Sequence, residues 1–210
     1  KVDVSRLTLQ VGKFSVTDVF DGNAYAKDTR KDFMNWALWA PGAFDYAADR
    51  LGLTYGATAE LNQKQWALRG GYFMMGAESN SNNFDTRIVQ RGQYVMELET
   101  RYSLFSQPGK LRTIGWLSSA YSGSYSETLA NPALNLDISK TREGRIKYGY
   151  VVNLEQALTD DIGVFVLLDR QMPSRLLGAF PEGVAVERLG LKEVVARTAA
   201  FLRHSNAAMR

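Results

Sequence analysis

The sequence contains no cysteine and a single histidine, His204, and both facts limit the chemistry available to it. Without cysteine the chain has neither a disulfide framework nor a thiolate metal site. A Ser/His hydrolase needs a histidine base beside its nucleophile, and His204 lies far from the strands predicted below. No phosphate-binding glycine loop and no metal-ligand spacing is found either. We therefore expect no catalytic residue, no metal and no cofactor.

Long apolar runs and one-sided charge are missing as well. No stretch approaches the roughly 18 uncharged apolar residues of a membrane-spanning helix. Residues 170–210 hold seven Arg or Lys and three Glu, so the net charge of +3 comes from this tail. Elsewhere both signs are interspersed, which argues against a nucleic-acid partner.

The first residues, KVDVSRLTLQ, lack an initiating Met and a signal-peptide layout, so we expect a processed or cut N-terminus.

Alternating apolar residues are what the chain does contain. Between residues 51 and 61 every second residue is apolar and those between are small or polar: Leu51, Leu53, Tyr55, Ala57, Ala59 and Leu61 form the apolar set. A period of two places the two sets on opposite faces of a β-strand. By alternation and by enrichment in β-branched and aromatic residues, the predicted strands are 5–16, 50–61, 64–75, 91–105, 110–122, 145–157 and 161–169.

The connections between the predicted strands alternate between short and long. Tight hairpins are expected at Asn62 and Gln63, at SQPG (106–109), and at Thr159 and Asp160. The links near 17–49, 76–90 and 123–144 run from roughly 15 to 33 residues, which is uncommon in compact soluble domains. Bacterial outer-membrane barrels pair short turns on one side with long loops on the other. The connections therefore favour a transmembrane β-barrel.

The polar face of the predicted strands must meet water. Glu97, Glu99 and Arg101 share one face of the strand 91–105, and unpaired buried charges are costly. We therefore expect lipid on the apolar face and water on the other. The alternative is a soluble all-β carbohydrate-binding module, a sandwich or lipocalin-like barrel whose apolar face forms a dry core. The two interpretations differ in which face is buried.

Several segments carry a resemblance to a known family. The stretch RLTLQVGKFSVTDVFDGNAYAKDTRKDFMNWALWAPGAFDYAAD (6–49), with LGLTYGATAELNQKQWALRGGYFMM, QYVMELETRYSLFSQPGKLR and GYVVNLEQALTDDIGVFV, resembles the carbohydrate-selective porins of the OprB type. The resemblance covers about residues 1–166. It implies a Gram-negative outer-membrane barrel of sixteen strands that admits small sugars by passive diffusion, with lipid and sugars as partners. The fold class expected is thus all-β, a partial antiparallel transmembrane β-barrel of about seven strands.

The tail departs from the family after Phe165. We divide the chain into a porin segment, 1–169, and an aberrant tail, 170–210, left by a frameshift, a truncation or a joined fragment. The alternative is a genuine tail whose helix binds a partner or a membrane surface. In the tail Leu191, Val194, Val195 and Leu202 follow helical spacing, which predicts a short basic amphipathic helix. Seven strands cannot close a pore alone. The remainder of the barrel or further copies of the chain would have to complete it.

The first long loop is the best candidate to fold inward and form a constriction. It combines charged and amide groups, which bind hydroxyls, with aromatic faces, which bind C–H edges: Asp18, Asp21, Asn23, Arg30, Lys31, Asp32, Trp36 and Trp39. The two tryptophans could instead only anchor the loop to the barrel wall.

The charged strand residues are the second set of candidates. Arg69, Glu97, Glu99 and Arg101 are expected to face the lumen by strand parity. Mutual pairing across neighbouring strands is the simpler interpretation of these four. Glu97 and Glu99 are weak evidence for a glycosidase, since any charged strand yields such carboxylate pairs.

Overall fold

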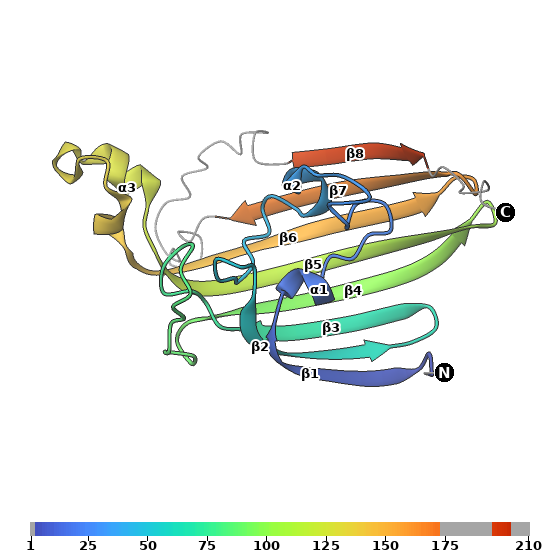
Figure 1. Ribbon diagram of the computed structural model, residues 1–210, viewed down its shortest axis with the longest axis horizontal. Helices are drawn as coiled ribbons and strands as arrows, with labels where there is room; N and C mark the ends of the chain where they lie inside the picture. Colours follow the sequence, from blue (N-terminus) through green and yellow to red (C-terminus); the bar gives the residue numbers. More distant parts are fainter. Residues whose placement is uncertain (1–2, 173–194, 203–210) are drawn as a thin grey trace, which may run out of the picture.

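The computed structural model describes residues 3–172 and 195–202 as an all-β chain. Its strands form one antiparallel sheet in sequence order, with β1 and β8 at the two edges (Figure 1). The strands are β1 (Arg6–Phe14), β2 (Thr54–Asn62), β3 (Trp66–Phe73), β4 (Gly92–Leu104), β5 (Gln107–Ser122), β6 (Glu143–Ala157), β7 (Ile162–Met172) and β8 (Val195–Leu202). The seven predicted strands are all present, and the sheet is open.

Short and long connections alternate as expected. The β4–β5 hairpin turns on Phe105 and Ser106, whose φ angles are +53° and +63°, so the predicted turn at 106–109 was placed too late. Two successive positive φ angles are typical of the two-residue turn that matches strand twist. The longer loops carry the short helices α1 (Val16–Val19), α2 (Trp36–Trp39), α3 (Tyr125–Ala130), η1 (Pro132–Leu134) and η2 (Ile138–Thr141). No helix within residues 3–172 and 195–202 is long and apolar enough to cross a membrane.

The two faces of the sheet differ sharply in character. We call the face that carries Leu68 and Leu98 the outer face; these two residues lie opposite each other on β3 and β4 and are 40% and 42% exposed. Glu97, on the inner face, is 1% exposed. Exposed apolar side chains cover the outer face of β1 to β6: Leu7, Leu9, Val11, Tyr55, Leu61, Trp66, Tyr94, Met96, Tyr102, Leu104, Leu117, Tyr121, Ile146 and Tyr150. The soluble module predicts the reverse arrangement and does not agree with this structure.

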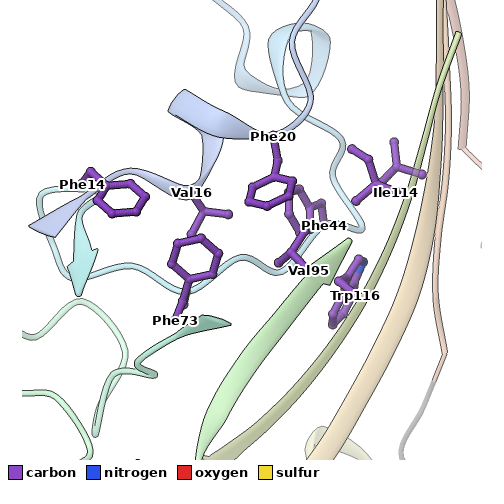
Figure 2. Close-up of a cluster of buried hydrophobic side chains, with 10 residues drawn as sticks. Phe14, Val16, Phe20, Phe44, Phe73, Val95, Ile114 and Trp116 are labelled. Atoms are coloured by element: carbon purple, nitrogen blue, oxygen red, sulfur yellow. The ribbon is translucent and has the colours of Figure 1, made fainter. Parts of the chain in front are cut away.

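The loop between β1 and β2 covers the inner face. Figure 1 shows α1 and α2 over one side of the sheet. An apolar cluster joins this loop to the strands (Figure 2): Phe14, Val16, Phe20, Phe44, Ala47, Phe73, Val95, Ile114, Trp116 and Val151 are all buried. The Phe73 ring lies edge-on to Phe14 and Phe20, with centroids 5.9 and 6.0 Å away. The predicted inward folding of this loop is therefore what the structure shows.

The described part of the tail differs from the helix expected there. Residues Val195–Leu202 form β8, which pairs antiparallel with β7. A strand edge presents unpaired N–H and C=O groups that a further segment can satisfy, and a short apolar run does not distinguish helix from strand by spacing alone. Strand β7 also extends to Met172, past the boundary drawn at 169. His204 and residues 173–194 lie outside the described residues.

Candidate functional site

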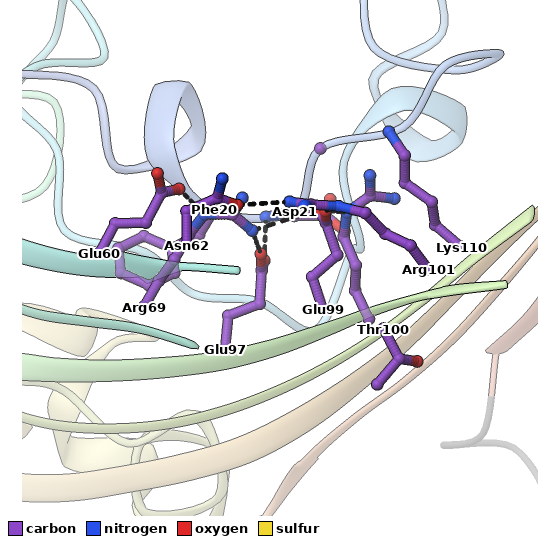
Figure 3. A network of polar contacts seen from close by, with 12 residues as sticks. Phe20, Asp21, Glu60, Asn62, Arg69, Glu97, Glu99, Thr100, Arg101 and Lys110 are labelled. Atoms are coloured by element: carbon purple, nitrogen blue, oxygen red, sulfur yellow. Dashed lines mark hydrogen bonds and ion pairs between the residues drawn. The ribbon is translucent and has the colours of Figure 1, made fainter. Parts of the chain in front are cut away.

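The charged residues of the inner face form a continuous ion-pair ladder across β2 to β6. Figure 3 shows the part of the ladder that contains Arg69, Glu97 and Glu99. Arg69 binds Glu60 through Nε, at 2.6 Å, and also pairs with Glu97. Arg112 binds Glu99 at 2.8 Å and Glu155 at 3.2 Å. The strand register places Arg69 opposite Glu60 on one side and opposite Glu97 on the other, and it places Arg112 opposite Glu99. Each buried charge in the ladder thus has a partner.

The predicted lumen-facing residues all belong to this ladder. Arg69, Glu97, Glu99 and Arg101 lie on the inner face, and Arg101 Nε is 2.7 Å from Glu99 Oε1. The mutual pairing that was the simpler interpretation of these residues is observed. Arg101 also donates to the backbone carbonyl of Gln63, at 2.8 Å, which ties the ladder to the β2–β3 turn.

Side chains of the wall hold the loop through its backbone N–H groups. Glu97 accepts a hydrogen bond from the N–H of Asp21, and Glu155 accepts one from Ala24, both at 2.6 Å. Further along the loop, Asp169 accepts from the N–H of Ala43, and Gln93 accepts from Ala47 at 2.7 Å. Buried backbone donors need such partners. The path of the loop is therefore set by acceptors on β4, β6 and β7.

Asp21 is buried between the loop and the wall. Its Oδ1 accepts a hydrogen bond from Asn153 Nδ2 at 2.6 Å, and its backbone carbonyl accepts one from Lys27 Nζ at 3.1 Å. Burial raises the pKa of the Asp21 carboxyl from 3.8 to about 7, against the opposing effect of the Lys27 charge. Asp21 thus lies in the contact between loop and wall.

Asn23 and Asp32 also have structural roles. Asn23 Nδ2 donates to Asn153 Oδ1 at 2.8 Å, and its own Oδ1 accepts from the backbone N–H of Tyr25. Asp32 Oδ2 accepts from two successive backbone N–H groups, those of Lys27 and Asp28, each at 2.9 Å. These two predicted site residues stabilise the shape of the loop.

The remaining predicted loop residues are more accessible. Trp36 is 61% exposed, and its ring stacks on Trp39 with centroids 6.2 Å apart and planes 21° apart. The Arg30 side chain is 90% exposed, and Asp18 and Lys31 are exposed too. The structure therefore separates the candidates into a group that bonds within the loop or to the wall and a more exposed group, Asp18, Arg30, Lys31 and Trp36.

Several wall residues that hold the loop were not predicted: Gln93, Asn153, Glu155 and Asp169. Arg112, which bonds Glu99 and Glu155 in the ladder, was not predicted either. Strand parity could have placed Asn153 and Glu155 on one face of β6. The partners across the sheet and along the loop could not be read from one strand. Within the part of the chain that the structure describes, no group of three or more His, Cys, Asp or Glu is placed to hold a metal ion.

An apolar exposed face, a charged covered face and a long loop folded onto the charged side are the features of the wall of a transmembrane β-barrel. In such barrels the lipid-facing side chains are apolar and the interior is polar, because every second residue of a strand faces the lipid. The same arrangement in water would expose a large apolar surface. The class of protein is thus a bacterial outer-membrane porin.

The comparisons with known proteins identify the family. The model of the carbohydrate-selective porin, OprB family, matches residues 1–178, and the chain belongs to that family. The match thus continues past Phe165, where the sequence alone indicated a departure. No curated protein matches the chain.

One similar solved structure is the high pH structure of Pseudomonas putida OprB. It matches with a TM-score of 0.58 at 16% identity, which shows the fold alone, and the match covers 79% of this chain. The chain spans 42% of the length of that structure.

Proposed function

We propose that this chain forms part of the wall and the constriction of a channel for passive diffusion of small sugars across the Gram-negative outer membrane. The observation that carries this proposal is the arrangement of the two faces of the sheet, which is the reverse of that in a soluble protein. The exposed face is apolar, and the face that the first loop covers is charged. No catalytic step is required, because diffusion depends only on the width and the polar lining of the channel.

The chemistry of the inner face suits neutral solutes. Within the described ladder, the cations Arg69, Arg101, Lys110 and Arg112 pair with the carboxylates Glu60, Glu97, Glu99 and Glu155. Paired charges produce little net field, so neither anions nor cations gain an advantage from this part of the wall. Sugar hydroxyls can still bind the polar edges of such pairs.

The accessible loop residues supply the sugar contacts in this proposal. The exposed face of Trp36 can pack on the C–H edge of a sugar ring, with Trp39 stacked behind it. Arg30 and Asp18 offer donors and acceptors for hydroxyls from exposed positions on the same loop. Lys31 is a further exposed donor.

The outer face is proposed to contact outer-membrane lipid. Tyr72 and Tyr94 pack together at 4.8 Å near the long-loop end of β3 and β4, and Trp66 and Tyr102 lie near the tight-turn end. Aromatic residues at both ends of an apolar band are typical of membrane interfaces. Further strands close the barrel in this proposal, from the remainder of a sixteen-stranded wall or from other copies of the chain.

Liposome swelling tests the proposal. The barrel that contains this chain is refolded in detergent, reconstituted into liposomes and diluted into isosmotic glucose. We expect faster swelling than in protein-free liposomes, and equal rates would refute the function. Stability of residues 1–166 in water without detergent would favour the soluble binding module instead.

A further inference from the structure

The loop segment that follows α2 is held to the wall at three backbone positions. Asp169 on β7 accepts a hydrogen bond from the N–H of Ala43, and Gln93 on β4 accepts one from Ala47. Gln93 also donates through Nε2 to the carbonyl of Asp45, at 2.7 Å. The Gln93 amide therefore binds the loop as both donor and acceptor.

These contacts lie close in sequence to the exposed Trp36 and the half-buried Trp39. The N–H of Ala40 bonds the carbonyl of Trp36 at 3.0 Å, which closes α2, and Pro41 and Phe44 are buried directly after it. The chain between Trp39 and Ala43 is three residues long. A shift of Ala43 away from the wall would therefore move the tryptophan pair with it.

Asp169 is costly to bury, which suggests that it has a specific task. It is 1% exposed, and among the described side chains its Oδ1 has no hydrogen-bond partner. A buried charge without a counter-ion lowers stability unless hydrogen bonds compensate. The bond to the N–H of Ala43 is the compensation that the structure shows.

We propose that Asp169 and Gln93 are positioning residues that set how far Trp36 and Trp39 project into the channel, and so determine the size of sugar admitted. Both are buried, at 1% and 0% exposure, and act without touching the solute. The inference rests on the proposed porin function. It assigns solute selection to side chains of the wall as well as to the loop that meets the sugar.

A substitution at Asp169 tests the proposal more directly than one at Glu97 or Glu155, the other wall carboxylates that bond the loop. Glu97 and Glu155 also pair with Arg69 and Arg112, so their removal would leave a buried cation short of a partner. Lys147 also bonds Asp45, at 2.8 Å, and none of the variants below replaces either residue. We therefore expect loosening of this segment rather than complete release.

The test compares Asp169→Leu with Asp169→Asn in the barrel that contains this chain. Leucine removes the acceptor at similar volume, whereas asparagine keeps an acceptor oxygen and removes only the charge. We expect Asp169→Leu to raise single-channel conductance and to admit disaccharides more readily relative to glucose in liposome swelling. Loss of a bond worth about 1.4 kcal/mol corresponds to about tenfold more of the displaced loop state. Asp169→Asn should resemble the wild type.

Glu60→Gln is the matched control, since it neutralises a wall carboxylate that bonds Arg69 and not the loop. We expect wild-type sugar ratios from it. If Asp169→Leu does not refold, Gln93→Leu tests the second anchor with the same expected result. Wild-type conductance and sugar ratios in a refolded leucine variant would overturn the proposal, as would equal changes in the leucine and asparagine variants. Failure of the wild type itself to admit glucose would instead refute the porin function.

A spin label gives a readout that does not depend on transport. These 210 residues contain no cysteine, so Met34→Cys introduces one labelling site among them, at a side chain that is 90% exposed and two residues before Trp36. We expect greater label mobility with Asp169→Leu and unchanged mobility with Asp169→Asn. Equal mobility in both variants and in the parent would count against the positioning role.

Discussion

Arg69 and Glu97 lie directly opposite each other on β3 and β4 and form an ion pair that the first loop covers. Their sequence neighbours Leu68 and Leu98 form the next pair along the two strands and are exposed. Burying the charges and exposing the leucines is favourable only where hydrocarbon meets the leucines and a polar loop meets the charges. These two neighbouring residue pairs therefore show how the sheet is built: one face is charged and covered, and the other is apolar and exposed.

Depth in the membrane should control the cost of a charge on the outer face. We expect Leu98→Lys, near the middle of β4, to lower the free energy of unfolding in lipid bilayers by about 2–4 kcal/mol. Leu104→Lys, at the tight-turn end of the same strand, should cost about 0–1 kcal/mol because it reaches the interface. Denaturant titration of the reconstituted barrel measures both. Equal costs at the two positions would argue against a lipid-facing surface.

Removal of Arg69 should destabilise the wall. Arg69 bonds Glu60 and pairs with Glu97 and Glu99, so Arg69→Met leaves buried carboxylates short of a partner and should cost about 3–5 kcal/mol. Arg6→Met is the control, because Arg6 is more exposed and lies 3.6 Å from Glu60. We expect that change to cost no more than about 1 kcal/mol. Unfolding of both variants in the same detergent provides the comparison.

The contact between loop and wall should weaken as pH rises. The carboxyl of Asp21 has a pKa of about 7 in the folded chain and 3.8 as its ordinary value, so the folded state binds the proton more tightly. Stability contributed at this position is then greatest below about pH 4 and falls as pH rises toward 7. A spin label at Met34→Cys should become more mobile over that window. Asp21→Asn should flatten the dependence, and an unchanged pH profile in that variant would contradict the assignment.

Replacement by alanine should have different effects at the exposed Trp36 and at the buried Trp116. Trp36 is 61% exposed, whereas Trp116 is 4% exposed within the apolar cluster. We expect Trp36→Ala to weaken glucose block of the channel current while leaving the unfolding transition nearly unchanged. Trp116→Ala should lower stability by about 3–5 kcal/mol. Glucose block that is unaffected by Trp36→Ala would remove this residue from the proposed sugar path.

The strands and their faces could be predicted from the sequence alone. The period of two in stretches such as 51–61 assigns each side chain to one face, and the charges on 97 and 99 indicate which face is polar. Alternating short and long links then predict the order of hairpins. The predicted turn between β4 and β5 was wrong because the turn lies at Phe105 and Ser106, where residues other than glycine adopt positive φ angles.

The contacts of the first loop depended on the tertiary structure. Asp21, Asn23 and Asp32 have the composition of a sugar site, yet the structure uses them to hold the loop, while Trp36 and Arg30 remain accessible. The wall acceptors Glu155, Gln93 and Asp169 bind backbone N–H groups, which every loop residue except proline possesses.

Local periodicity therefore determined which side of each strand is apolar, since that property repeats along a single strand. Which loop atoms meet which wall side chains was decided only when strands distant in sequence came together. The sequence does not indicate which side chain will accept a hydrogen bond from a given backbone N–H group.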